Sequence, residues 1–171
     1  SLSVVEQSTD ISPRSPQTSR PALEDGAVAR DMRARITHGP VLLETKSKFQ
    51  GHAARVESVE EVDAMVSILL ENNAIRRATH NVMAYRFALP SGSGWVQDSD
   101  DDGESAAGAC LLNLLRLTAA TNVCIVVSRW YGGVHLGPAR FTLFKKAARQ
   151  TLEEAGLLPE QGGKDKKKGG K

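Results

Sequence analysis

The chain has 171 residues, a length typical of a single domain, and 40% of them are hydrophobic, which is enough for one ordinary core. No apolar run approaches the roughly 18 residues that span a bilayer, and the N-terminus has no apolar block of a signal peptide. We therefore expect a cytoplasmic protein without membrane contact. A mitochondrial presequence is the alternative, but acidic residues dilute the Ser, Thr and Arg content of the first 35 residues.

The net charge of +2 is unevenly distributed along the chain. Residues 164–171 contain five lysines and one aspartate, which leaves 17 basic and 19 acidic residues elsewhere. This tail is interpreted either as solubilising or as a salt-sensitive contact with RNA. The two cysteines, Cys110 and Cys124, stand among apolar residues and are predicted to be buried, reduced thiols.

Composition divides the chain into three parts. Residues 1–35 are rich in Ser, Thr, Pro and Arg, show no apolar period and are predicted to be disordered. Residues 36–157 carry the periodic segments of one α/β domain. Residues 158–171 form a Lys- and Gly-rich tail that is also predicted to be disordered.

The first elements of the domain are two short strands and a helix. Residues 41–44 and 49–56 are typical of strands that pair as a hairpin around a polar turn. Ser58 and Glu61 match a capping box, in which the Ser58 hydroxyl accepts from the Glu61 amide and the Glu61 carboxylate binds the Ser58 amide. The helix that follows is predicted to end near Asn72.

The next elements are two strands joined by a Gly- and Ser-rich loop. Residues 79–89 form the longest strand candidate, and Tyr85, Phe87 and Leu89 indicate its buried side. Residues 95–97 are predicted to return as a short partner strand.

The last three elements are a helix, a strand and a helix. Residues 106–118 read as an apolar helix, and the β-branched run 122–128 is typical of a central strand covered on both faces. Pro138 suits the first position of the final helix, and Gly156 suits its end. The order ββαββαβα predicts an α/β (α+β) fold whose sheet is mixed or antiparallel, with helices mostly on one face.

Residues 98–104 contain five carboxylates in seven positions. An EF-hand register places Asp100 and Asp102 at ligand positions and Gly103 at the sixth position, but position twelve is Ala109 and no helix pair flanks the segment. We therefore predict no metal site. Capping of the following helix is favoured, with recruitment of a basic partner or paired acids for hydrolysis as alternatives.

The Gly-rich segment from Arg129 to Arg140 follows the central strand and precedes a helix. Its spacing matches neither the dinucleotide nor the P-loop fingerprint, and Pro138 removes one amide from the helix start. A tight strand-to-helix turn is the main interpretation, and an anion or RNA contact through Arg129, His135 and Arg140 is the alternative. His80 is interpreted as a hydrogen-bonded core histidine. No zinc spacing or esterase elbow is present, so we predict no catalytic residue and no cofactor.

Four ordered motifs resemble the conserved domain of the IMPACT family. They are Lys46-Ser-Lys-Phe49, Ala78-Thr-His-Asn81 with Tyr85, Asp101-Asp-Gly-Glu104, and Arg129-Trp-Tyr-Gly-Gly133 with Leu136-Gly137. Trp130 and Pro138 are similar to the eukaryotic branch rather than to the bacterial one. The residues that we expect to form a binding site are Lys46, Ser47, Phe49, His80, Asn81, Tyr85, Asp101, Asp102, Gly103, Glu104, Arg129, Trp130, Tyr131, Gly132, Gly133, Leu136, Gly137 and Arg140.

The resemblance implies a fold like the second domain of ribosomal protein S5, for which we expect a four-stranded sheet. It also implies a non-enzymatic regulator that binds the ribosome-associated co-activator of the amino-acid-starvation kinase and so restrains phosphorylation of the initiation factor. Actin is a further implied partner, and a monomer is expected. RNA or ribosome binding is the second hypothesis, and a hydrolase is the third, because older labels on bacterial relatives suggest peptidase activity. The family's N-terminal RWD domain needs about 100 residues, so we expect the chain to be either a fragment or a single-domain form.

Overall fold

A computed structural model describes residues 22–160 of the chain. Its centre is an antiparallel sheet of five strands in the order β1-β2-β5-β3-β4. The strands are β1 (Thr37–Glu44), β2 (Ser47–Arg55), β3 (His80–Ala88), β4 (Trp95–Asp100) and β5 (Val123–Trp130). The helices are α1 (Ala22–Arg35), α2 (Val59–Leu69), α3 (Asn73–Arg76), α4 (Ala107–Leu117) and α5 (Ala139–Glu154). The predicted fold class is confirmed, with five strands where four were expected.

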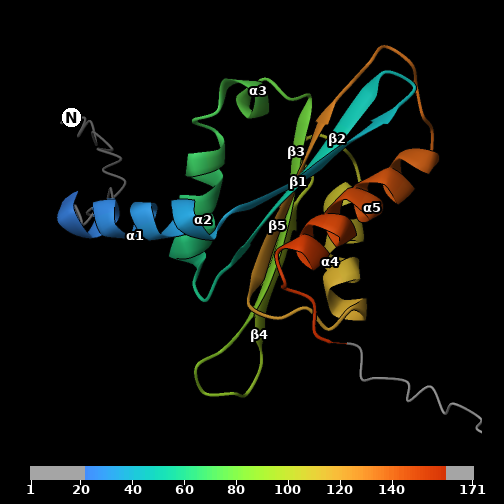
Figure 1. The fold of residues 1–171 in the computed structure, drawn as a ribbon. Helices are drawn as coiled ribbons and strands as arrows, with labels where there is room; N and C mark the ends of the chain where they lie inside the picture. Colours follow the sequence, from blue (N-terminus) through green and yellow to red (C-terminus); the bar gives the residue numbers. More distant parts are fainter. Residues whose placement is uncertain (1–21, 161–171) are drawn as a thin grey trace, which may run out of the picture.

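Helices cover both faces of the sheet, as Figure 1 shows. On one face α5 packs against β1 and β2, and α4 packs against β3 and β4. On the other face lies α2, with α1 packed against it. The sequence predicted helices mostly on one face. The second layer is needed because β5 is buried along nearly its whole length, as its β-branched run indicated.

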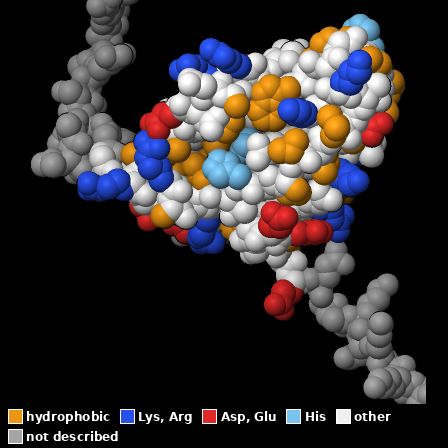
Figure 2. Space-filling model, turned by 45° about the horizontal axis from the view of Figure 1, so that its top comes forward, with side chains coloured by type: hydrophobic (Ala, Val, Ile, Leu, Met, Phe, Trp, Pro, Cys, Tyr) orange, Lys and Arg blue, Asp and Glu red, His pale blue; other side chains and the backbone are white. Residues whose placement is uncertain are grey.

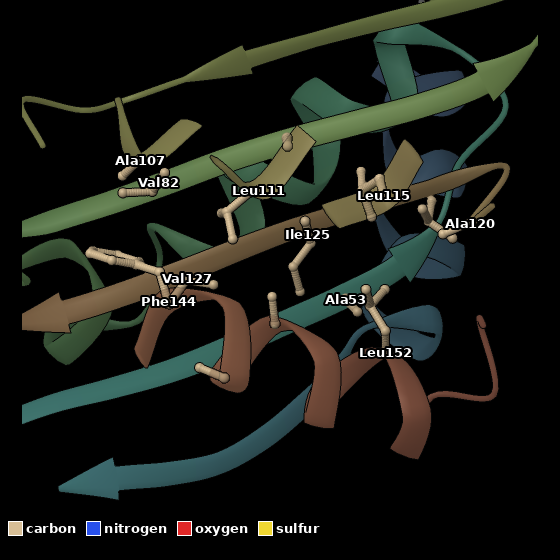
Figure 3. Packing of buried hydrophobic residues seen from close by; sticks show 14 of the residues in the cluster. Ala53, Val82, Ala107, Leu111, Leu115, Ala120, Ile125, Val127, Phe144 and Leu152 are labelled. Atoms are coloured by element: carbon tan, nitrogen blue, oxygen red, sulfur yellow. The ribbon is translucent and has the colours of Figure 1, made fainter. Parts of the chain in front are cut away.

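The larger core lies between the sheet and the pair α4 and α5. In Figure 3, Val82, Ile125 and Val127 from the strands point toward Leu111 and Phe144 from the helices. A smaller core lies under α2 and includes Met65, Phe87, Cys124 and Val126.

The prediction of the buried side of β3 is confirmed for Phe87 alone, because both faces of the strand are covered. Val82 and Ala84 are fully buried in the larger core, whereas Tyr85 and Phe87 face the smaller core and Leu89 is 37% exposed. The physical reason is that helix α4 approaches β3 closely, so small side chains fit there and the aromatic rings lie on the less covered face.

Helix α1 lies in a segment that the sequence predicted to be disordered. Met32 is buried in the smaller core, and Arg33 pairs with Glu71 at 2.6 Å. Arg35 pairs with Asp31 and with Glu61. These tertiary contacts hold a helix that lacks an apolar period, which is why the sequence pattern missed it. The lysine tail and residues 1–21 lie outside the described residues.

Local end signals of the helices are largely confirmed. Ser58 caps α2 by accepting from the Glu61 amide at 3.2 Å, although the Glu61 carboxylate contacts Arg35. Asn72 caps the short helix α3 through the Ala74 and Ile75 amides, and α2 ends earlier, at Leu69. Gly156, with φ of +67°, follows the end of α5.

Burial of the cysteines is confirmed for Cys124 and not for Cys110, which is partly exposed. Both thiols are free, and burial raises the pKa of Cys124 to about 12. Within residues 22–160, no helix is both long enough and apolar enough to cross a bilayer.

Candidate functional site

Three of the sequence motifs are brought together by neighbouring strands at one end of the sheet. Arg129 on β5 is paired with Phe49 on β2 and with His80 on β3. The fourth motif, residues 101–104, follows β4, which pairs with β3. Antiparallel pairing therefore places residues from four distant parts of the sequence around the C-terminal end of β5.

The centre of this arrangement is the buried carboxylate of Glu104. It accepts a hydrogen bond from Arg129 Nη1 at 2.6 Å and another from Arg140 Nε at 2.8 Å. His80 Nε2 lies 3.8 Å away. Burial raises the pKa of Glu104, but the hydrogen bonds and charges of Arg129 and Arg140 outweigh that effect, so its pKa lies below the ordinary value.

Aromatic rings hold the Arg129 side chain in place. Its guanidinium lies 5.4 Å from the Phe49 ring centre and 5.7 Å from the Tyr131 ring centre, and Phe49 packs edge-on against Phe144 at 5.2 Å. Arg140 also donates to the Gly137 carbonyl at 2.8 Å. The segment from Arg129 to Arg140 is thus fixed at both ends.

The single carboxylate of Glu104 pairs with both Arg129 and Arg140, so it balances only one of their two positive charges. Arg129 is only 6% exposed, so the geometry disfavours the predicted anion or RNA contact through that residue, whereas Arg140 is 26% exposed. The Glu104 carboxylate is likewise occupied by two donors and ionised, which disfavours the hydrolase hypothesis for it.

A hollow of about 370 Å³ opens beside Glu104. Its wall includes Tyr131 and His135, whose rings are 5.6 Å apart. The Thr79 hydroxyl in this wall accepts from the Tyr131 amide at 2.9 Å. The hydrogen bond between Thr79 and Tyr131 thus holds the loop after β5. The aromatic rings of Tyr131 and His135 give the hollow a surface that could bind a ligand.

The hairpin between β1 and β2 touches the same loop. Thr45 and Lys46 have positive φ values of 43° and 66°, which is typical of a tight two-residue hairpin turn. Ser47 Oγ accepts from the Gly132 amide at 3.2 Å. A Cβ atom at Gly132 would lie 2.1 Å from the Lys46 carbonyl oxygen, so this close approach requires glycine.

The acidic segment before α4 acts mainly as a cap. The Asp101 carboxylate accepts from the Gly108 amide at 2.7 Å and from the Ala106 amide at 3.1 Å, which confirms the capping interpretation. Asp102 accepts from the Asn81 amide at 2.8 Å. Within residues 22–160, no group of three or more His, Cys, Asp or Glu side chains is placed to hold a metal ion.

A buried polar chain adjoins the site and was missed by sequence reasoning. His52 Nε2 lies 3.0 Å from Ser128 Oγ, which donates to Asn81 Oδ1 at 2.6 Å, and the two Nδ1 atoms of His38 and His52 are 2.8 Å apart. Burial, aided by the charge of His38, lowers the pKa of His52 to about 3. No local motif signals this chain of hydrogen bonds, because its members come from four strands.

The remaining predicted residues lie around the cluster or away from it. The Trp130 indole donates to the Ala74 carbonyl at 2.9 Å on the α3 side of the sheet. Gly103, Gly133 and Gly137 have positive φ values in the two loops, and Leu136 packs against the larger core. Tyr85 stacks on Phe87 further along β3 and is not brought to the cluster.

Comparison with known proteins identifies relatives of this chain. The family described as the Impact N-terminal domain matches residues 45–152. The chain is 42% identical over 145 residues to Protein IMPACT of Rattus norvegicus, covering 78% of this chain and 46% of the relative. It is 43% identical over 132 residues to the Protein IMPACT homolog of Schizosaccharomyces pombe, covering 74% of this chain and 47% of the relative. The chain therefore spans about half the length of these curated relatives.

Two solved structures are similar to this fold. One is the two-domain translational regulator Yih1, with a TM-score of 0.52, 37% identity, and coverage of 70% of this chain and 46% of that one. The other is a hypothetical protein with a TM-score of 0.58, 23% identity, and coverage of 70% and 61%, a likeness that concerns the fold alone.

Proposed function

The chain belongs to the Impact N-terminal domain family, and we propose that it acts as a non-enzymatic, protein-binding module in the control of translation. Its similarity to a translational regulator at 37% identity supports this role. Its similarity to Protein IMPACT from animals and fission yeast agrees with it.

One observation carries the proposal: the family-motif residues bind chiefly to one another. Glu104 is held by Arg129 and Arg140, and Gly132 contacts the hairpin turn. The same loop leaves the apolar side chains of Tyr131 and Val134 each 42% exposed. A rigid framework that presents apolar side chains supports recognition of a protein partner better than it supports catalysis.

We call this surface the hairpin–loop end and define it as residues 41–48 and 131–137. It combines the β1–β2 hairpin with the loop after β5, which are joined by the contact between Ser47 and Gly132. Both segments leave the sheet at the same end, as Figure 1 shows.

The proposed partner is the ribosome-associated co-activator of the amino-acid-starvation kinase. Occupation of the co-activator by this module would compete with the kinase and so restrain phosphorylation of the initiation factor. Actin is a second proposed protein partner. The family resemblance supports both partners and a cytoplasmic setting.

Affinity capture from amino-acid-starved cells tests the proposal. The bait is the full chain, and the readout is immunodetection of the co-activator and of the kinase that it retains. We expect the wild type to recover the co-activator and to lower the amount of kinase bound to it.

Two variants of exposed residues locate the contact. Tyr131→Ala with Val134→Ala should lose the co-activator, because it removes apolar surface from the hairpin–loop end. The control is Leu117→Ala, which should behave as wild type. Leu117 is 77% exposed and precedes β5, so it lies at the end of β5 that is remote from the hairpin–loop end. The proposal would be contradicted if neither the wild type nor any folded variant recovered the co-activator.

A further inference from the structure

A second hollow, of about 490 Å³, lies between the β1–β2 hairpin and α3. It is on the sheet face opposite α4 and α5 and does not contain Glu104. The residues that line it are His38, Val41, Lys46, Lys48, Gln50, His52, Asn72, Ala74, Ile75, Trp130 and Tyr131. Figure 2 shows histidine and hydrophobic side chains gathered on the face it presents, with lysine and arginine side chains around them.

The strand register explains why these side chains share one face. Leu43 is paired with Lys48, which is paired with Trp130 across β2 and β5. Val41 is paired with Gln50 in the same way. Because paired residues in a sheet project to the same side, the outer rows of this face combine apolar, basic and aromatic groups.

The edge of the sheet at β1 is open for pairing. Glu44 and Ser47 close the two-residue turn, so the next bonded pair along the ladder is Leu42 with Phe49. This alternation points the backbone N–H and C=O groups of Val41 and Leu43 away from β2. Their side chains are 54% and 68% exposed, which is a combination that edge strands normally avoid.

The hollow is basic and has a rigid wall. No Asp or Glu lines it, and within residues 22–160 neither Lys46 nor Lys48 forms an ion pair. Glu44 alternates with Leu43 and so points to the opposite face. The hydrogen bond from the Trp130 indole to Ala74 fixes that ring.

We propose that this hollow and the β1 edge bind an acidic, extended segment of a protein partner. The segment adds a strand beside Val41–Glu44, places apolar side chains against Val41 and Trp130, and places carboxylates near Lys46 and Lys48. The proposal rests on the protein-binding function proposed above and specifies the chemistry of the partner.

The edge geometry favours a peptide over RNA. The outward backbone groups of Val41 and Leu43 are matched by the backbone of an added strand, which supplies donors and acceptors in register. The exposed apolar side chains at the same two residues add contacts that a phosphate backbone does not use.

The test uses a fluorescein-labelled decapeptide in which valine and glutamate occupy alternate positions of one strand face and threonine stands between them, with the same peptide carrying lysine in place of glutamate as its control. Fluorescence anisotropy with the full chain should show binding of the acidic peptide and not of the basic one. Hydrogen exchange followed by NMR should show new protection of the Val41 and Leu43 amides. The amides of Leu42 and Glu44 face β2 and should change little.

Two independent variants probe the two halves of the proposal. Leu43→Pro removes an outward donor at an edge position, where proline is tolerated, and should abolish the new protection. Lys46→Glu with Lys48→Glu should weaken peptide binding about tenfold, which corresponds to about 1.4 kcal/mol. The matched control, Lys145→Glu with Lys146→Glu, reverses two exposed charges on α5 and should leave binding unchanged.

Several outcomes would overturn this inference. The first two are that the acidic peptide does not bind, or that it binds without protecting the Val41 and Leu43 amides. The other two are that oligouridylate binds in place of the peptide and depends on Lys46 and Lys48, or that the chain associates with itself through β1. Peptide binding without recovery of the co-activator would instead count against the proposed function alone. Recovery of the co-activator without peptide binding would count against the inference alone.

Discussion

Arg129 donates to the carboxylate of Glu104 at 2.6 Å, although the two residues stand 25 positions apart and belong to different motifs. Their side chains are only 6% and 8% exposed. This contact joins the loop before α4 to the end of β5, and Arg140 extends it to the start of α5. The motifs are therefore parts of one salt-bridged framework.

The framework predicts a large loss of stability for Glu104→Gln. The change leaves the buried guanidinium of Arg129 without its charged partner, so the free energy of unfolding should fall by about 3 kcal/mol. Urea denaturation at pH 7 measures this. Glu153→Gln, which disrupts an exposed pair with Arg149 on α5, is the matched control and should change stability by about 0.5 kcal/mol or less. Equal effects of the two variants would show that Glu104 does not hold the framework.

The buried His52 predicts a pH dependence of stability. Its pKa is about 3 in the folded chain, against an ordinary value of 6.5. Between these values the unfolded state takes up a proton and the folded state does not, so stability falls as the pH drops below 6.5 and is unaffected above it. Between pH 7 and pH 5 this effect of His52 should lower the free energy of unfolding by about 2 kcal/mol.

His52→Gln isolates this contribution from that of the other histidines. Its unfolding free energy should depend less on pH between 7 and 5 than that of the wild type. Glu104, whose pKa is lowered from 4.5, adds a second loss of stability only at lower pH, because a lowered carboxyl pKa stabilises the fold above the unfolded value. Identical pH profiles of variant and wild type between 7 and 5 would argue against a neutral, buried His52.

The contact between the hairpin and the loop predicts different outcomes for two adjacent glycines. Gly132→Ala should destabilise the chain by about 3 kcal/mol, because its Cβ would overlap the Lys46 carbonyl. Gly133→Ala meets no atom within 4 Å and is penalised only by its φ of +90°, which costs about 1 kcal/mol. Thermal unfolding of both variants measures the difference, and a smaller loss for Gly132→Ala would contradict the close approach.

The Asp101 cap predicts a moderate loss of stability for Asp101→Ala. Two amides at the start of α4 lose their acceptor, so the free energy of unfolding should fall by about 1 to 2 kcal/mol. Asp98→Ala is the control: its carboxylate is exposed and, among the residues that the structure describes, accepts only from the adjacent Ser99 amide. Chemical denaturation that ranks Asp98→Ala as the more damaging change would refute the capping role.

Local signals in the sequence predicted most of the secondary structure. The Ser58 cap, the β-branched run of β5 and the end of α5 just before Gly156 depend on neighbours in the chain, so they could be predicted from it. Helix α1 could not, because it is held by contacts such as those of Met32 and Arg35 with α2 and the smaller core.

The sites were less predictable than the elements that carry them. The motifs identified the residues that gather at one end of the sheet, but the sequence grouped Glu104 with its acidic neighbours. Its partners, Arg129 and Arg140, come from β5 and α5, and only the strand register brings them together. The hollow beside β1 was missed for the same reason, since Lys48 and Trp130 are paired across strands.

Photo-cross-linking tests the central claim, that the hairpin–loop end is a protein-binding surface in translational control. A photoreactive phenylalanine analogue is placed at Val134 in one form of the chain and at Leu117 in another, both exposed apolar positions. After irradiation in amino-acid-starved cells, the account predicts a cross-link to the co-activator from position 134 and none from position 117. A cross-link to the co-activator from position 117 alone, or to RNA alone from position 134, would contradict it.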